Sequence, residues 1–171
     1  LDGLNYWLHR GQHRWHWWWQ LHALHHAQQQ MTQWSDNRNH LLDDLIRDLI
    51  LIVVAQCFGI APSQYVAIVA LTQLSENLQH ANLRLWFGRF GERLWVSPRF
   101  HRMHHAVGSG ERQNCNFAVL LPCWDMLFGT ANFEHRYEAT GVRDQLTLGR
   151  DYGRGFWAQQ WLGLKRLAGR A

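Results

Sequence analysis

The sequence is poor in cysteine, and its cysteines do not form a recognisable set. The three residues, Cys57, Cys115 and Cys123, are an odd number and contain no C-x-x-C motif. A disulfide framework uses paired cysteines, and a zinc ribbon needs them at short spacing, so the sequence argues against both. A reducing compartment is the simplest environment for such a chain.

The chain also lacks the motifs of several common protein classes. It has no glycine-rich motif for a flavin or nicotinamide and no haem-attachment motif. Its net charge is +4 with histidine counted as neutral, but the basic residues are scattered and no nucleic-acid-binding motif accompanies them. We therefore expect no nucleic acid partner. There is no signal peptide, and because the chain begins at Leu1 we expect sequence upstream of it to be missing.

Charged residues are absent from a long central stretch. Residues 49–75, the 27 positions between Asp48 and Glu76, contain no Asp, Glu, Lys or Arg. This run is long enough to cross a bilayer once, but "GIAPS" predicts a turn in its middle. We expect two helices, 41–60 and 63–85, each about 30 Å long at ~1.5 Å per residue. They would form a membrane-embedded hairpin; the alternative is a hairpin buried in a soluble helical protein.

The rest of the chain also favours helices, so we expect an all-α fold with one domain over residues 1–171. A returning hairpin would place Asp48 and Glu76 on the same side of the membrane and bring together the histidines that flank the gap. The tail is predicted either to lie at the membrane interface or to pack on the domain core. The other expected segments are a helix over 1–31 bent near Trp15 to Trp18, a loop over 32–40, a short helix from Ser97 to Gly108, an irregular region over 109–153, and a tail helix over 155–170.

Histidine is the most informative residue type, with twelve in the chain. Three groups repeat at short spacing, "HRGQH" at 9–13, "HALHH" at 22–26 and "HRMHH" at 101–105. Residues at i, i+3 and i+4 of a helix share a face, so each group projects together. Neutral imidazole is a good ligand for iron, zinc, copper and nickel. Because one metal needs only three or four of them, we predict two metals, held by His9, His13, His22, His25, His26, His80, His101, His104 and His105.

Five stretches together carry a resemblance to a known family. "YWLHRGQH", "HALHH", "LQHAN", "SPRFHRMHH" and "CWDMLFGT" resemble the fatty acid hydroxylase and sterol desaturase superfamily, from about Asp2 to the tail. The resemblance implies an integral membrane enzyme with a cytosol-facing helical metal domain and two iron ions. It also implies transmembrane helices upstream of Leu1. His16 stands where relatives often have proline, and Gln20 where they often have arginine.

The same resemblance assigns roles residue by residue. His9 and His13 match the first histidine box, and His80 matches the isolated histidine of the family. His40, in "NRNH", falls where many relatives have histidine, as a ligand or a supporting residue. A ligating imidazole usually donates its other N–H to an acceptor, and the candidates are Asp2, Glu76, Asn82, Asn116 and Asp125. Asp125 could instead be a turn or cap residue. His22, His25 and His26 match the second box, and His101, His104 and His105 match the third.

The implied function is that of a membrane-bound non-haem di-iron oxygenase. It would hydroxylate or desaturate a lipid, using O2 as co-substrate, and the purified protein could hold zinc in place of iron. Because no redox cofactor motif is present, electrons would come from a separate reductase, ferredoxin or cytochrome. The metal site would face the cytoplasm, with a bacterial inner membrane favoured over the endoplasmic reticulum. The alternative is a non-catalytic membrane protein that binds or transports metal, although the hairpin offers few polar residues for transport.

Overall fold

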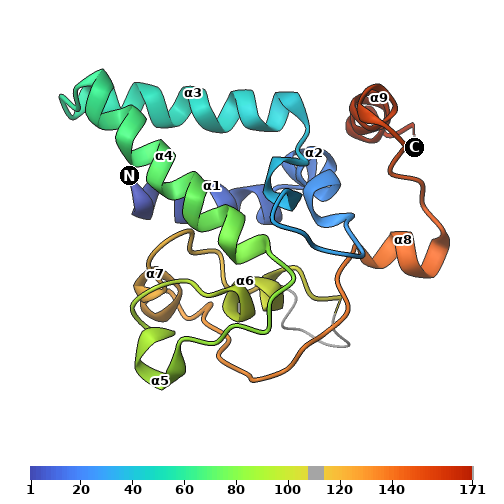
Figure 1. Cartoon of the computed structure of the whole chain (residues 1–171). Helices are drawn as coiled ribbons and strands as arrows, with labels where there is room; N and C mark the ends of the chain where they lie inside the picture. The colour runs from blue at the N-terminus through green and yellow to red at the C-terminus, as the bar shows by residue number, and fades with distance from the viewer. Residues whose placement is uncertain (108–113, 171) are drawn as a thin grey trace.

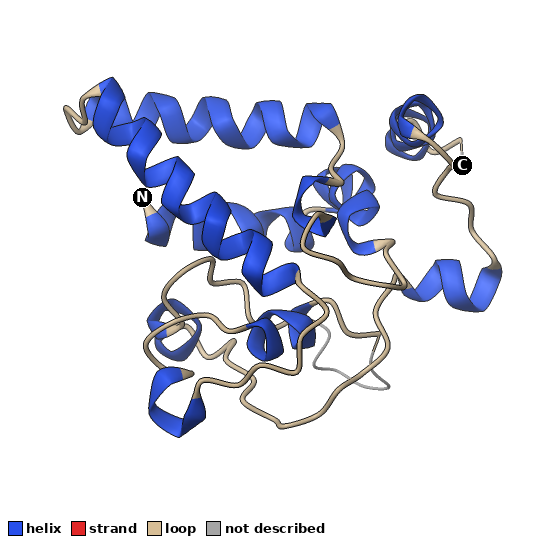
Figure 2. Ribbon diagram, in the orientation of Figure 1, coloured by secondary structure: helices blue, strands red, loops and turns tan. Residues whose placement is uncertain are grey.

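The computed structural model describes residues 1–107 and 114–170, and regular structure within them is helical (Figure 1, Figure 2). An isolated antiparallel bridge joins Ala106 to Thr140. The all-α prediction is confirmed for these residues. The elements are α1 (Asp2–Arg14), α2 (His16–His26), the 3-10 turn η1 (Ser35–Asn37), α3 (Leu41–Cys57), α4 (Pro62–His80), α5 (Gly88–Gly91), α6 (Pro98–His104), α7 (Cys123–Leu127), α8 (Arg143–Leu148) and α9 (Phe156–Leu167).

The first two helices form a bent pair, as the sequence predicted. Trp15 separates them because its backbone is extended, with φ −93° and ψ 118°. The second helix ends at His26, before the predicted limit of residue 31. The bend lets the first two histidine groups face each other across the angle between α1 and α2.

Helices α3 and α4 form the predicted hairpin, at one edge of the molecule in Figure 1. The first ends at Cys57, before the predicted residue 60, and the second ends at His80, before the predicted residue 85. The chain leaves α4 there because Ala81 is extended, with ψ 140°. Asp48 and Glu76 line one cavity of about 230 Å³ between the two helices. The polar ends of the hairpin therefore meet at one place.

The outer face of the hairpin is apolar and exposed. The exposed fractions of Val53, Phe58 and Leu74 are 58%, 81% and 70%. The described part of the chain therefore leaves this face of the hairpin uncovered. Among the described residues, however, no helix combines the length and the apolar character needed to cross a bilayer.

A buried polar network fixes the start of α6. Ser97, the predicted cap, accepts a hydrogen bond from the backbone N–H of Phe100 (3.1 Å) and donates one to Glu92 Oε1 (2.6 Å). Arg99 makes an ion pair with the same carboxylate, which is also buried. The helix ends at His104, and residues 105–107, which were predicted to continue it, are not helical. The predicted last residue, Gly108, lies outside the described residues.

The segment 114–153 was predicted to be irregular, but it contains α7 and α8. Each has only five or six residues, which is too short for a helical repeat of apolar residues to be recognised in the sequence. Much of the remaining segment is loop. Its first part contacts α1 and α4, because the carbonyl oxygen of Phe117 lies 2.9 Å from His9 Nδ1 and that of Val119 accepts from Gln79 Nε2 at 2.8 Å.

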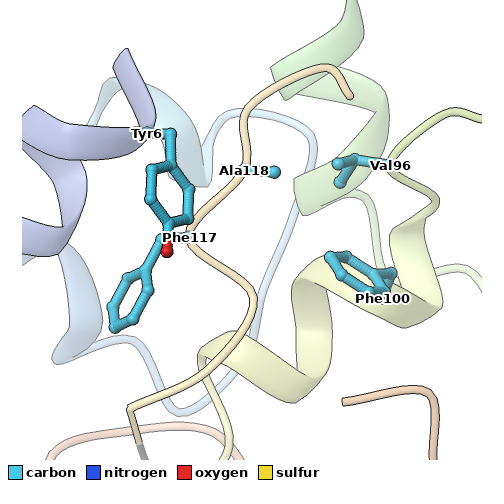
Figure 3. Packing of buried hydrophobic residues seen from close by; sticks show 5 residues of the cluster. All are labelled: Tyr6, Val96, Phe100, Phe117 and Ala118. Carbon is cyan, nitrogen blue, oxygen red and sulfur yellow. The ribbon is translucent and has the colours of Figure 1, made fainter. Parts of the chain in front are cut away.

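One hydrophobic cluster joins this loop to the helices that carry histidines (Figure 3). Tyr6 comes from α1, Val96 and Phe100 come from the start of α6, and Phe117 and Ala118 come from the loop. All five are buried. The cluster therefore fixes the first and third histidine boxes relative to each other.

The tail helix α9 packs on α2 through one face and leaves the other uncovered. Gln160, Gly163 and Arg166 lie on its buried face, and the Nε of Arg166 donates to the backbone carbonyl of Gln20. Trp157 is 78% exposed on the outer face. Packing on the domain is therefore confirmed for one face, and the aromatic outer face still fits a membrane interface.

Candidate metal centre

The structure gathers all nine predicted histidines into two neighbouring clusters. Within each cluster, one ring nitrogen from every residue lies within 4.8 Å of the corresponding nitrogens of the others. The rings of His26 and His105, one from each cluster, stack with their centroids 4.2 Å apart. The five-histidine cluster contains His9, His13, His22, His26 and His104, and the four-histidine cluster contains His25, His80, His101 and His105.

Each H-x-x-H-H group is divided between the two clusters. In the second box, His22 and His26 belong to the five-histidine cluster, and His25 belongs to the four-histidine cluster. In the third box the division is reversed: His101 and His105 belong to the four-histidine cluster, and His104 belongs to the five-histidine cluster. Helix geometry permits this, because at about 100° per residue i+4 lies roughly 40° to one side of i and i+3 lies roughly 60° to the other side, on the same broad face.

In the four-histidine cluster, the side chains meet through their Nε2 atoms. The Nε2 atom of His80 lies 3.1 Å from that of His25 and 3.0 Å from that of His101. The Nε2 of His105 lies 3.1 Å from that of His101. The other nitrogen of His80, Nδ1, is 2.8 Å from the backbone carbonyl of Glu76. When Nδ1 donates there, the Nε2 lone pair of His80 faces its neighbours.

The five-histidine cluster has the same organisation. His9 Nδ1 lies 2.9 Å from the carbonyl oxygen of Phe117, and His104 Nδ1 lies 2.8 Å from that of Cys115. A carbonyl can only accept, so each Nδ1 carries the proton and each Nε2 presents a lone pair. The Nε2 of His104 lies 3.1 Å from the Nε2 of His26.

Burial lowers the pKa of eight clustered histidines: His9, His13, His25, His26, His80, His101, His104 and His105. It lowers the pKa of His104 to about 3, against a hydrogen bond to Cys115 that acts in the opposite direction. Burial also lowers the pKa of His9 and of His13 well below the usual value, and the neighbouring histidines add to this effect. Because the neutral form is the one that binds metals, the side chains are ready to act as ligands at neutral pH.

The donor set fits a metal that prefers imidazole. Two nitrogens bound at ~2.0–2.1 Å to one zinc ion, at angles of about 90–110°, lie roughly 2.8–3.4 Å apart, which includes the Nε2 separations seen here. The Nε2 atoms of His13 and His22 are buried and have no hydrogen-bond partner among the described residues, as expected of atoms reserved for a metal. The nitrogen-only set suits iron, zinc or copper.

Asp43 supports the site and was not predicted to do so. Its Oδ2 lies 3.0 Å from His22 Nδ1, and its Oδ1 accepts hydrogen bonds from Gln12 Nε2 and Trp18 Nε1, both at 2.7 Å. A carboxylate that orients a ligand histidine in this way fixes its tautomer and direction. The sequence marks Asp43 only as a polar residue at the start of the hairpin, and no spacing connects it to His22.

His40 lies outside both clusters, so its prediction as a ligand is wrong. It caps α3, where its Nδ1 accepts from the backbone N–H of Leu42 at 3.2 Å. Its Nε2 lies 2.9 Å from the carbonyl oxygen of Gln160 in α9. The residue therefore ties the hairpin to the tail helix and makes no contact with a clustered histidine.

Five residues were predicted to accept a hydrogen bond from a ligand histidine. Four of them bond to other groups, and the fifth accepts from a histidine through its backbone carbonyl. Glu76 receives His80 through its carbonyl oxygen. Asp2 accepts from the N–H groups of Leu120 and Leu121 and from Trp124 Nε1. Its prediction as a direct partner of a histidine is wrong.

Asp125 and Asn116 also stabilise the loop and contact no clustered imidazole. Asp125 accepts from the N–H groups of Phe117 and Ala118, both at 2.8 Å, as the turn-or-cap alternative predicted. Asn116, with φ +57°, donates to the carbonyl of Phe100 at 2.9 Å. Both fix the loop that supplies the carbonyls for His9 and His104.

Asn82 has no part in the metal centre. Its side-chain oxygen accepts from Tyr137 at 2.6 Å and from Arg102 at 3.3 Å. The prediction that it orients a ligand is wrong, because the turn after α4 carries it away from the clusters.

Comparison with known proteins assigns the family. The fatty acid hydroxylase family model matches residues 1–130. An ornithine lipid hydroxylase of Rhizobium tropici is 28% identical over 72% of this chain and 37% of its own length. An alkylglycerol monooxygenase of Caenorhabditis elegans is 26% identical over 78% of this chain and 26% of its own length. The match thus spans 37% of the length of the first relative and 26% of the length of the second.

No solved structure gives a significant match. The family match covers both helices of the bent pair, the hairpin and the third box, and therefore every clustered histidine. The chain belongs to the fatty acid hydroxylase family.

Proposed function

We propose that the protein is a membrane-bound lipid hydroxylase with one iron ion in each histidine cluster. The observation that supports this most strongly is the grouping of nine histidines into two sets whose ring nitrogens converge. Two sets of nitrogen ligands leave room for O2 as co-substrate. Bound iron supplies the oxidation of an unactivated C–H bond, which amino-acid side chains cannot perform.

The residues of the chain itself have three tasks in this proposal. The histidines hold the metals through their inner nitrogens. Asp43 and the carbonyls of Phe117, Cys115 and Glu76 hold the outer nitrogens and so fix the ring orientations. The buried packing of α2 and α6 shields the four-histidine cluster, whose members are all buried.

Both relatives are named for the oxidation of a lipid, an ornithine lipid in one case and an alkylglycerol in the other. Their names favour hydroxylation over desaturation for this chain, with a lipid as substrate. Electrons would come from a separate reductase, ferredoxin or cytochrome. Comparison of lipid extracts from cells with and without the intact gene would identify the substrate by mass spectrometry.

The proposed location is a membrane, with the hairpin embedded and the metal centre on the cytoplasmic side. The exposed apolar residues of α3 and α4 support it, as does the aromatic outer face of α9. Trp15 and Trp17 are half exposed and stack parallel to each other, with an interplanar angle of 10°. Exposed tryptophans are typical of proteins at a membrane interface.

The first prediction concerns His104. Replacing His104 by alanine removes one nitrogen from the five-histidine cluster, so we expect the bound iron to fall from about two ions per chain to about one. Lipid oxidation should fall to background. Metal content would be measured by mass spectrometry, and O2-dependent lipid product by chromatography with an added reductase and ferredoxin.

His16→Ala is the matched control, because His16 is exposed and lies outside both clusters. This variant should keep its metal and most of its activity. Equal loss in both variants, or normal iron in His104→Ala, would contradict the proposal. Two bound iron ions with no lipid product under any reducing condition would favour the non-catalytic alternative.

The second prediction concerns the carboxylate behind His22. Asp43→Asn keeps the size of the side chain but removes the charge that orients the imidazole, so the affinity for metal should fall by about 10–100-fold. Competition with a chelator would measure it. Asp48→Asn is the control, because Asp48 is about half exposed and pairs only with Arg47. Equal affinity for metal in the unaltered protein, Asp43→Asn and Asp48→Asn would exclude a positioning role for Asp43.

The third prediction concerns the membrane. Val53→Glu combined with Val66→Glu places two charges on the exposed face of the hairpin, where the exposed fractions are 58% and 65%. Flotation with liposomes should show at least ~10-fold weaker binding, since buried charge is costly in lipid. Leu94→Glu with Leu127→Glu, at positions 70% and 69% exposed outside the hairpin, is the control. Equal flotation of the two double variants would refute the embedded hairpin.

A further inference from the structure

A cavity of about 490 Å³ opens directly onto the five-histidine cluster. His13, His26 and His104 form its inner end. Its volume is within the ~300–1,000 Å³ range of small-molecule sites. The space that borders the four-histidine cluster has only about 40 Å³. The two clusters therefore differ, because the first borders a space that can hold an organic molecule.

The walls of this cavity combine apolar and polar surface in about equal parts. Trp19 of α2 lies on one side, and Val107, Val142 and Leu148 contribute further apolar surface. The outer wall comes from α8, which is tethered to the end of α2 by a hydrogen bond of 3.3 Å from Gln145 Nε2 to the carbonyl of Ala27. In Figure 1, α8 lies beside that end of α2.

The mouth of the cavity carries an unneutralised positive charge. Arg143 is exposed there, and no acidic side chain in the described part of the chain pairs with it. Its neighbour Asp144 is occupied, because it accepts from Arg150 and from the hydroxyl of Tyr152, both at 2.9 Å. The mouth is therefore suited to an anionic group.

From these features we infer that the cavity is the substrate site and takes the hydrocarbon chain of an anionic amphiphile. The chain lies between Trp19 and α8, with the carbon to be oxidised beside His13, His26 and His104. A carboxylate or phosphate rests at Arg143. The inference rests on the proposed function, and it assigns the substrate to the five-histidine cluster.

The wall helix lies outside the part of the chain that the family model matches. That match ends at residue 130, whereas α8 spans Arg143–Leu148. Residues that select the lipid would therefore include some that lie beyond the matched segment. Thr147 lines the cavity from an exposed position and is a suitable place to test this.

The test is photolabelling of the zinc-loaded full chain, which needs no turnover. The probe is hexadecanoic acid with a diazirine near its methyl end, and labelled peptides are mapped by mass spectrometry. We expect labelling of the α2 peptide that contains Trp19. Thr147→Trp fills the cavity and should reduce this labelling at least tenfold. Leu146→Trp is the matched control, because Leu146 lies in the same helix, is 45% exposed and does not line the cavity.

A second arm tests the charge at the mouth. Diazirine-bearing hexadecanoic acid, hexadecyl phosphate and hexadecanol have similar chains and differ in their end groups. The unaltered protein should label better with one or both anionic probes than with the alcohol, and the better anion identifies carboxylate or phosphate as the preferred group. Arg143→Gln should remove the preference.

The inference is overturned when labelling is confined to α3 and α4, when both tryptophan variants label like the unaltered protein, or when the alcohol labels as well as both anions. These results are separable from failure of the proposed function. A protein that holds two iron ions and oxidises lipid, but is labelled elsewhere, keeps the function and loses this site. A labelled cavity in a protein without oxidation keeps the site and loses the function.

Discussion

The structure depends on bringing nine imidazoles together, four of which, His9, His22, His80 and His104, have their second nitrogen held by a carbonyl or a carboxylate. Nitrogen atoms only 3.0–3.1 Å apart would repel each other if both rings were protonated, so burial and mutual proximity favour the neutral form. A neutral ring has one N–H, and in His9, His104 and His80 that N–H has a carbonyl partner outside the cluster. The lone pairs are thereby directed inward.

The acceptors come from segments far from the histidines in the sequence. The carbonyls of Phe117 and Cys115 lie on a loop that Asp125, Asn116 and Asp2 hold with their side chains. These three residues support the site indirectly. They hold the loop in place, and the carbonyls of the loop orient the rings of His9 and His104. The loop between α6 and α7 is thus as important for the metal centre as the helices.

Sequence reasoning predicted the parts of the site that depend on local geometry. The helical spacing was sufficient to identify eight of the nine clustered histidines, and the family resemblance supplied the isolated His80. The turn at Pro62 was sufficient to predict the hairpin. It failed where tertiary packing decides. Asp43 meets His22 only because α1, α2 and α3 pack together, and His40 points to α9 although it lies near the boxes in sequence.

The division of each box between two clusters also required the structure. Spacing shows that three histidines share a helical face, but not that the i+3 residue leans toward a different neighbour from the i and i+4 pair. That depends on how the helices pack, and the Tyr6 cluster contributes to it by holding α1 against α6 and the loop through long-range contacts.

The central claim is that the chain holds two metal ions through histidine nitrogen. Zinc content together with X-ray absorption of the zinc-loaded protein tests it most directly. The account predicts two zinc ions per chain, each surrounded by imidazole nitrogens at ~2.0–2.1 Å. A single ion per chain, or a sulfur ligand at ~2.3 Å, would contradict it.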